Sequence, residues 1–338
     1  MAKPAVFGLA ERGDVSALTA ALDAGGDVEE RGDRGESPLT AAAASGHGAC
    51  VTLLLARGAN VEHANSGGAT ALLAASHAGH ADIVRALIDA GANVARANRA
   101  GVTPLFAAVE NAEVVRALLA GKADPNQPTR SGRLPLSAAR TPDVAKALLE
   151  GGASLDARDP EGKTALHHAA GSARADVVLF LLDAGASADV LDNSGATPLA
   201  DGIRELLKAS AVEATLALVR ATREIDAKGY RGQTAFSVAA ELGHVEVAKA
   251  LLSAGADLES RDAAAMTPLH WAAYENAEVT TRFLLDAGAD VSARDAEGKT
   301  PRELVEDAIA HEASSTRGSF FSEGNAPDRT AVLALFAR

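Results

Sequence analysis

Aromatic side chains are scarce in this chain of 338 residues: eight Phe, two Tyr and one Trp make up 3% of it. Isoleucine is also rare, with five positions, whereas Ala fills 79. An all-β sandwich or barrel draws its core from β-branched and aromatic residues, so this composition argues against one. Because Ala has the highest helix propensity, the sequence predicts a mostly helical protein whose helices approach one another closely.

Cysteine and long apolar runs are missing too. The single Cys, Cys50, cannot form a disulfide within the chain, which fits a reducing compartment. The chain has no run of about 18 apolar residues, and its N-terminal segment lacks the apolar stretch of a signal peptide. We therefore expect a cytoplasmic protein with no place in a membrane. Arg outnumbers Lys 24 to 8, which together with the excess of Ala suggests a bacterial, GC-rich genome.

Basic residues are too few for a general nucleic-acid binder. The net charge is −13, and residues 170–338 hold 16 Lys and Arg against 26 Asp and Glu. Binding to a phosphate backbone requires a dense basic face, so nucleic acid is an unlikely partner. One local exception is the stretch Arg96–Arg140, which has seven basic and three acidic residues. An acidic chain of this kind favours a protein partner, such as one with a basic patch.

A short motif recurs nine times along the chain, at steps of 33, 33, 31, 30, 33, 37, 33 and 33 residues. A Gly stands two residues before the motif in eight of the nine cases, and Ala265 takes the ninth. Such a period indicates one array of stacked units, where the length alone would suggest two domains. The motif reads Ser37-Pro38-Leu39, Thr70-Ala71-Leu72, Thr103-Pro104-Leu105, Leu134-Pro135-Leu136, Thr164-Ala165-Leu166, Thr197-Pro198-Leu199, Thr234-Ala235-Phe236, Thr267-Pro268-Leu269 and Thr300-Pro301-Arg302.

Each unit has the residues that begin and end two helices. Thr is a good N-cap and Pro suits the first helical position, so the motif begins a first helix. A pair of small residues follows, such as Ala272-Ala273, which lets neighbouring helices approach closely. The second helix has an apolar pair such as Leu284-Leu285 and ends at Gly-Ala, where the Gly can adopt a left-handed cap conformation.

These features resemble the ankyrin repeat. The units closest to that pattern are Thr267-Pro268-Leu269-His270-Trp271-Ala272-Ala273 and Thr164-Ala165-Leu166-His167-His168-Ala169-Ala170. The resemblance implies an all-α solenoid of stacked helix pairs with short β-hairpin turns, in which each unit buries its apolar faces against its neighbours. It predicts one ankyrin-repeat domain over 1–338, made of an N-terminal capping unit (4–34), repeats (35–297) and a C-terminal capping unit (298–338).

Three units depart from the regular length. The fourth and fifth lack residues at the loop between their helices, so we expect clipped first helices there. The seventh is longer, and Ile203–Lys208 is expected to extend its first helix. These departures are either neutral drift in loops, which tolerate insertions, or changes that fit the stack to one partner.

Catalytic and metal-binding motifs are not found, so we expect neither an enzyme nor a cofactor or metal. The resemblance assigns His167 and His270 to hydrogen bonds between turns, a structural role. The C-terminal capping unit should hold a helix over Pro301–Glu312, a loop over Ala313–Pro327 containing Phe320-Phe321, and a helix over Asp328–Phe336. An effector activity in that loop is a less favoured alternative, because the segment is too short for a catalytic domain.

In the family, partners are usually bound by the turn tips and the inward face of the first helices, positions with no duty in the scaffold. Both Tyr residues fall there, and Tyr, Trp and Arg are the usual energetic anchors of interfaces. A basic row follows the tips of the fourth to sixth units. The predicted partner-binding residues are Tyr230, Arg231, Gln233, Met266, Trp271, Tyr274, Glu275, Arg99, Arg130, Arg133 and Lys163.

Purely structural explanations of these residues also fit the sequence. Trp271 could simply pack between helices, and the basic row could be a solvated edge. The leading interpretation is a non-catalytic protein–protein interaction module, monomeric when free, that holds an unidentified protein on its concave face. A narrower version is an inhibitor or antidote that occludes a basic enzyme or toxin.

Overall fold

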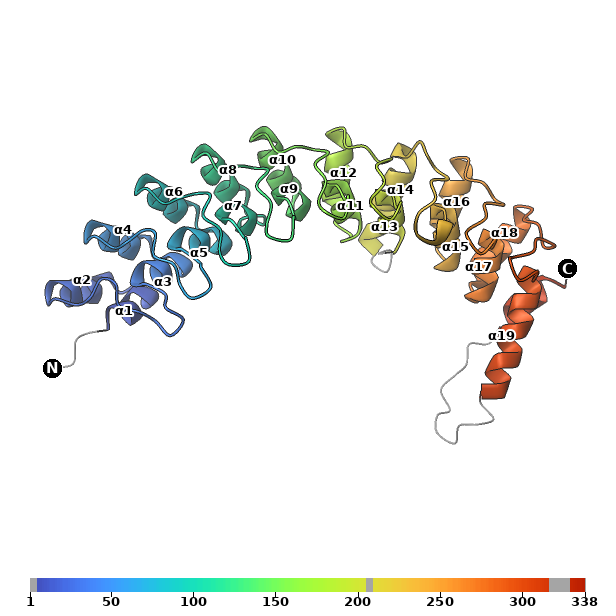
Figure 1. Ribbon diagram of the computed structural model, residues 1–338, viewed down its shortest axis with the longest axis horizontal. Coiled ribbons are helices and arrows are strands. Elements are labelled where there is room, and N and C mark those ends of the chain that lie inside the picture. Colours follow the sequence, from blue (N-terminus) through green and yellow to red (C-terminus); the bar gives the residue numbers. More distant parts are fainter. Residues whose placement is uncertain (1–4, 205–208, 316–328, 338) are drawn as a thin grey trace. The chain divides into compact units, whose positions relative to one another are not determined.

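The computed structural model describes residues 5–204, 209–315 and 329–337, and within these ranges the secondary structure is entirely helical. The helices follow one another in pairs, as the repeat predicts. In each pair the odd-numbered helix is the first helix of a unit and the even-numbered one is the second (Figure 1). Contacts divide the chain into two compact units: an N-terminal unit, Met1–Pro160, and a C-terminal unit, Glu161–Arg338.

The N-terminal unit has two layers of helices. Neighbouring first helices contact one another along the chain, and the second helices do the same. The first helices are α1 (Val6–Arg12), α3 (Pro38–Ala44), α5 (Ala71–Ala78), α7 (Pro104–Ala107) and α9 (Pro135–Ala138), and the second helices are α2 (Val15–Asp23), α4 (Gly48–Ala56), α6 (Ala81–Asp89), α8 (Ala112–Ala120) and α10 (Pro142–Glu150).

The C-terminal unit repeats this arrangement. Its two layers again form by contact between successive first helices and between successive second helices. The first helices are α11 (Ala165–Ala170), α13 (Pro198–Arg204), α15 (Ala235–Glu241), α17 (Pro268–Tyr274) and α19 (Pro301–Ser315), the second helices are α12 (Ala175–Asp183), α14 (Ala209–Ala221), α16 (Val245–Ser253), α18 (Glu278–Asp286) and α20 (Thr330–Leu335), and a 3₁₀ turn, η1 (Tyr230–Gly232), precedes α15.

The helix ends form as the motif predicts. In α5, α7 and α15 the hydroxyl of the preceding Thr accepts a hydrogen bond from the backbone N–H three residues later. The Gly residues of the Gly-Ala pairs after the second helices have positive φ, for example 82° at Gly58 and 91° at Gly288. Buried Ala side chains such as Ala42 and Ala272 fill the spaces between first helices, so few rings are needed in the core.

The turns between units are hairpin-like but too short to form strands in the described ranges. Each is closed on itself, as where the N–H of Asn65 donates to the carbonyl of Ala69 at 3.0 Å. Several turns also donate to the preceding turn, as where the N–H of Ser66 donates to the carbonyl of Arg34 at 3.0 Å. Where they form, these bonds link successive turns and fix where the turn side chains lie.

His167 and His270 have the structural role that the resemblance assigned. In His270, Nδ1 accepts from the N–H of Thr267 at 3.1 Å and Nε2 donates to the carbonyl of Lys299, 3.1 Å away in the next turn. His167 does the same with Thr164 and Ala196. Both contacts require a neutral ring with its proton on Nε2, and burial lowers the pKa of both imidazoles.

The irregular units behave largely as expected. The clipped first helices are confirmed, since α7 and α9 have four residues each. The predicted extension over 203–208 is seen only to Arg204, because 205–208 lie outside the described residues. The C-terminal helices form over Pro301–Ser315 and Thr330–Leu335, and Val305, Val332 and Ala273 make a small core between them and α17. Phe320-Phe321 also lies outside the described residues.

Candidate functional site

Tyr230 and Arg231 stand at the turn that leads into α15. Tyr230 is 57% exposed, and the guanidinium of Arg231 lies 5.3 Å from the centroid of its ring. Arg231 has φ of 59°, a left-handed conformation that a non-Gly residue rarely adopts, and its carbonyl accepts from the next turn, from the N–H of Ala263 at 2.9 Å. The backbone therefore holds this aromatic–cationic pair at the surface, as predicted.

Gln233 is a correction to the predicted surface. It is 5% exposed, and its side-chain amide donates to Oε2 of Glu241 at 2.8 Å. The bond runs from the second residue before α15 to the last residue of that helix. Gln233 therefore lies beneath the surface and positions the carboxylate of Glu241.

Trp271 is the second correction. It is 9% exposed, and its indole N–H donates to Oδ2 of Asp262 in the preceding turn at 2.9 Å. The other carboxylate oxygen of Asp262 accepts from the backbone of Ala264 and Met266, both at 2.9 Å. Trp271 thus ties the first helix to its turn, which is the packing role left open above, and Met266 is left half-buried at the turn.

Tyr274 and Glu275 stand at the opposite end of α17. Tyr274 is 44% exposed, and the guanidinium of Arg329 lies 6.0 Å from its ring centroid and donates to its backbone carbonyl. Burial and the negative charge of Glu241 raise the pKa of Glu275 above its ordinary value, while Arg329 opposes the shift. The C-terminal capping unit therefore reaches this end of the first-helix layer.

The two Tyr residues do not touch as a cluster. Tyr230 precedes α15, whereas Tyr274 is the last residue of α17, the next first helix (Figure 1). A helix of this length spans about 10 Å, so the two rings bracket the first-helix layer. Glu241, the last residue of α15, and Glu275, which directly follows α17, lie close enough to interact electrostatically. The arrangement therefore places an acidic pair at the C-terminal ends of two neighbouring first helices, the end at which Tyr274 stands.

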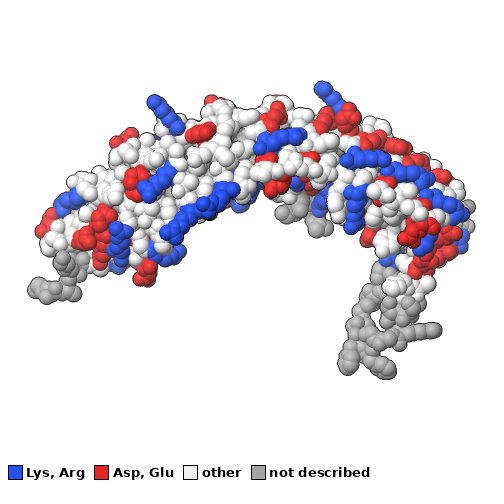
Figure 2. Space-filling model, viewed as in Figure 1, with Lys and Arg blue, Asp and Glu red and all other residues white. Residues whose placement is uncertain are grey.

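The arginines of the predicted basic row lie at the turn edge of the N-terminal unit. Arg99, Arg130 and Arg133 are exposed, and none of them forms an ion pair among the described residues. Figure 2 shows Lys and Arg side chains gathered along this edge beside an uncharged surface. An ideal Cβ on Gly101 would come within 2.3 Å of the backbone N of Arg130, so the two turns touch.

Lys163 does not belong with these arginines, which is a third correction. Its ammonium lies 2.8 Å from Oδ2 of Asp201 and 3.7 Å from Oδ2 of Asp192. Both carboxylates are well buried, so the three groups form a partly desolvated network inside the C-terminal unit. The charge of Lys163 is therefore neutralised within the fold.

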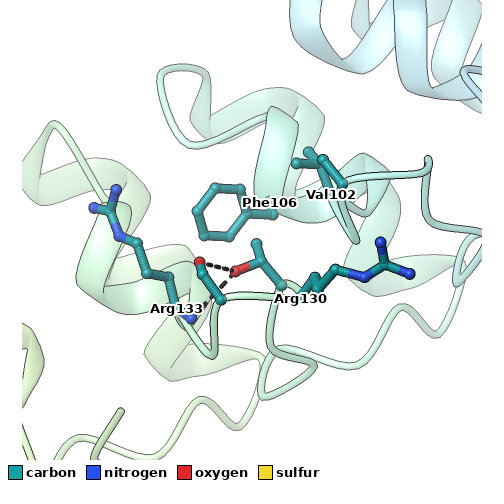
Figure 3. Close-up of a pocket in the computed structure, with 7 residues that line it drawn as sticks. Val102, Phe106, Arg130 and Arg133 are labelled. Atoms are coloured by element: carbon teal, nitrogen blue, oxygen red, sulfur yellow. Dashed lines mark hydrogen bonds between the residues drawn. The ribbon is translucent and has the colours of Figure 1, made fainter. Parts of the chain in front are cut away.

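A hollow of about 480 Å³ lies beside these arginines (Figure 3). It is lined by Ala100, Val102, Phe106, Thr129, Arg130, Ser131 and Arg133. The sequence reasoning missed Phe106, although a signal exists: Phe106 occupies the motif position that holds His167 and His270 in other units. A phenyl ring cannot bond to the next turn as those imidazoles do, and here it remains half-buried on the floor of the hollow.

Other kinds of site are not seen in the described ranges. No group of three or more His, Cys, Asp or Glu side chains gathers there in a way that could hold a metal ion. None of the described helices is long and apolar enough to cross a membrane.

Comparisons with known proteins agree with the repeat pattern. A family model described as ankyrin repeats, in three copies, matches residues 7–98, 59–129, 136–209 and 205–295. Among solved structures, the human ASB11 ankyrin repeat domain is 30% identical with a TM-score of 0.56, over 64% of this chain and 97% of that one. No curated protein matches the chain.

Proposed function

Because the chain belongs to the ankyrin-repeat family, whose members are generally protein–protein interaction modules, we propose that it is a non-catalytic module that holds a protein partner. The proposed surface consists of the turn tips and first helices of the C-terminal unit. Its contact residues are Tyr230, Arg231, Met266, Tyr274 and Glu275. Gln233 and Trp271 support this surface from beneath.

The observation that carries the proposal is the exposure of both Tyr residues of the chain. The core is built from Ala and Leu, so the fold does not need these two rings for packing. Tyr230 and Tyr274 are instead 57% and 44% exposed. Exposed aromatic side chains are the anchors that interfaces use most, because they cover a large area and have few rotatable bonds. Both lie on the turn and first-helix side, which is the side that has no role in contacts between second helices.

The test is affinity capture from a lysate of the source cells, with Tyr230→Ala and Tyr274→Ala combined in one variant. We expect partner recovery to fall by about tenfold or more, since two interface anchors each contribute upwards of about 1 kcal/mol. The thermal unfolding midpoint should barely move. The matched control combines Val279→Ala and Val291→Ala, which truncate two exposed side chains outside the first helices. Equal recovery by both variants would refute the proposed surface.

A second candidate is an inhibitor or antidote that covers a basic enzyme or toxin. The acidic pair Glu241 and Glu275 favours it, because two neighbouring carboxylates suit a basic partner, and burial together with the charge of Glu241 raises the pKa of Glu275. A captured enzyme would lose activity in proportion to added protein, and the inhibition would weaken at high salt. An active enzyme in the saturated complex would exclude this candidate.

Further features of the proposal follow from the sequence. We infer that the chain works in the cytoplasm, since its only Cys, Cys50, is buried and unpaired. The composition suggests a bacterial source. We also infer a free monomer whose residues 1–338 act as one repeat domain capped by 4–34 and 298–338. Nucleic acid remains a disfavoured partner, since Lys163 is already paired.

A further inference from the structure

We propose that the hollow beside Phe106 binds an acidic peptide segment of a partner protein. One apolar side chain of the segment sits on Phe106 and Val102, and flanking carboxylates pair with Arg130 and Arg133. The inference rests on the proposed function in one respect only, that the partner is a protein. It concerns a surface of the N-terminal unit, whereas Tyr230 and Tyr274 lie in the C-terminal unit.

The hollow has an apolar floor and cationic sides. Val102 comes from the turn before α7, Phe106 comes from α7 itself, and Arg130 and Arg133 come from the next turn (Figure 3). Its volume of about 480 Å³ falls within the range of small-ligand pockets. Such a space takes one large apolar side chain while leaving the neighbouring residues of a peptide over the arginines.

The turn that carries the arginines is held rigidly. The N–H of Arg133 donates to Oγ1 of Thr129 at 3.2 Å, and its carbonyl accepts from the N–H of Thr129 at 2.9 Å. Oγ1 of Thr129 also lies 3.0 Å from Oγ of Ser131, and the N–H of Gly132 donates to the carbonyl of Thr129 at 2.9 Å. Because the backbone is already ordered, a ligand loses less of its binding free energy to ordering this turn.

The charges explain why the ligand is acidic. Some turn cations have acidic partners, as Arg34 has Glu36 and Arg96 has Glu62. Arg99, Arg130 and Arg133 have no such partner in the described part of the chain, although the chain as a whole holds 45 Asp and Glu against 32 Lys and Arg. A guanidinium binds a carboxylate through two parallel hydrogen bonds, so these exposed groups are suited to carboxylates on another molecule.

The same features favour a peptide over a nucleic acid. Binding along a phosphate backbone grows with the number of cations in the track, and among the described residues this edge offers Arg99, Arg130 and Arg133 without an ion pair. A peptide needs fewer charges because its apolar side chain adds contact area on Phe106. Nucleic acid is nonetheless one outcome that the experiment distinguishes.

The test measures the fluorescence anisotropy of a labelled peptide of Asp and Glu with one central Leu, titrated with the full chain. We expect Arg130→Ala combined with Arg133→Ala to weaken binding by about tenfold or more. Phe106→Ala should weaken it by several-fold. Replacing the peptide's Leu by Gly should cost as much with the wild-type chain, and this arm does not depend on the folding of any variant. The matched control is Arg85→Ala with Arg116→Ala, which removes two exposed guanidinium groups from α6 and α8.

Three results would overturn the inference: no binding of the peptide, equal weakening by the Arg85 and Arg116 control, or tighter binding of a single-stranded oligonucleotide than of the peptide. The variant with Tyr230→Ala and Tyr274→Ala should bind the peptide as the wild type does. Capture of a partner that depends on the two Tyr residues, without peptide binding, would end this inference and leave the proposed function standing.

Discussion

Two threonine hydroxyls in the second helix α18 are buried without a hydrogen-bond partner among the described residues. Thr280 is 1% exposed and Thr281 is 0% exposed. The same two helical positions hold apolar side chains in other second helices, such as Val114 and Val115 in α8. Because Val has the shape of Thr with a methyl group in place of the hydroxyl, Thr280→Val and Thr281→Val should stabilise the fold.

The magnitude follows from what the hydroxyl loses on burial. A buried polar group without a partner costs about 1–3 kcal/mol, and the Val methyl adds favourable apolar burial. Thr and Val have similar helix propensities, so the helix itself is little affected. We therefore expect each substitution to raise the free energy of unfolding by about 1 kcal/mol or more.

The assay is urea unfolding followed by circular dichroism, with the midpoint and slope fitted separately. A higher midpoint at an unchanged slope is the expected result, since the slope reports the surface exposed on unfolding. The control is Thr52→Val, because the Thr52 hydroxyl is exposed and donates to the carbonyl of Gly48 at 3.0 Å. An unchanged or lower midpoint for Thr281→Val would refute the reasoning, since it would mean that the hydroxyl is satisfied in solution.

Three further changes test the turns and caps. Ala265 has φ of 56° where the other eight turns use Gly, so Ala265→Gly should stabilise the fold by about 0.5–1 kcal/mol in the same urea assay. The pKa of His270 is lowered by burial, so the unfolded chain binds a proton near its ordinary pKa of about 6.5 while the folded ring stays neutral. Stability should therefore fall as the pH drops from about 7.5 to about 5.5, and His270→Gln should flatten that dependence in denaturation curves. In thermal melts, Gly101→Ala should lower the unfolding midpoint more than Gly91→Ala does. Both Gly residues have positive φ, but only at Gly101 would a Cβ meet the backbone of Arg130. Equal decreases in the midpoint would show that the two turns move apart to accept the Cβ.

The repeat spacing was sufficient to predict the fold. The Thr N-caps, the left-handed Gly residues and the small side chains between first helices each meet a need of the local backbone or packing. Each need selects a particular residue type, so it can be recognised in the sequence. The clipped helices α7 and α9 were predicted for the same reason, since residues missing at the loop between the two helices of a repeat shorten its first helix.

The side chains of the site could be predicted only in part. Tyr230 and Tyr274 were placed at the surface correctly, because their positions have no scaffold role. Gln233, Trp271 and Lys163 were not, since each has a partner brought close only by the fold: Glu241, Asp262 and Asp201. A repeat pattern shows which positions are free of the scaffold but not which of them find a neighbour.

Phe106 shows the opposite failure. Its motif position is structural where a His stands, and no role was predicted for Phe106 from the sequence. The hollow depends on the turn Thr129–Arg133 in the next unit, which presents two arginines around that ring. The sequence shows that Phe106 stands where a His would bond to the next turn. The hollow that this change leaves can be recognised only in the folded structure.

The most direct test of the central claim is photo-cross-linking of the chain to its captured partner. A photoreactive amino acid replaces Tyr230, Tyr274 or Val279 in separate chains, all three being exposed positions of the C-terminal unit. Positions 230 and 274 should form covalent adducts with the partner, because they lie at the turn and first helix, and position 279 on α18 should not. Adducts at position 279 without adducts at 230 and 274 would contradict the account.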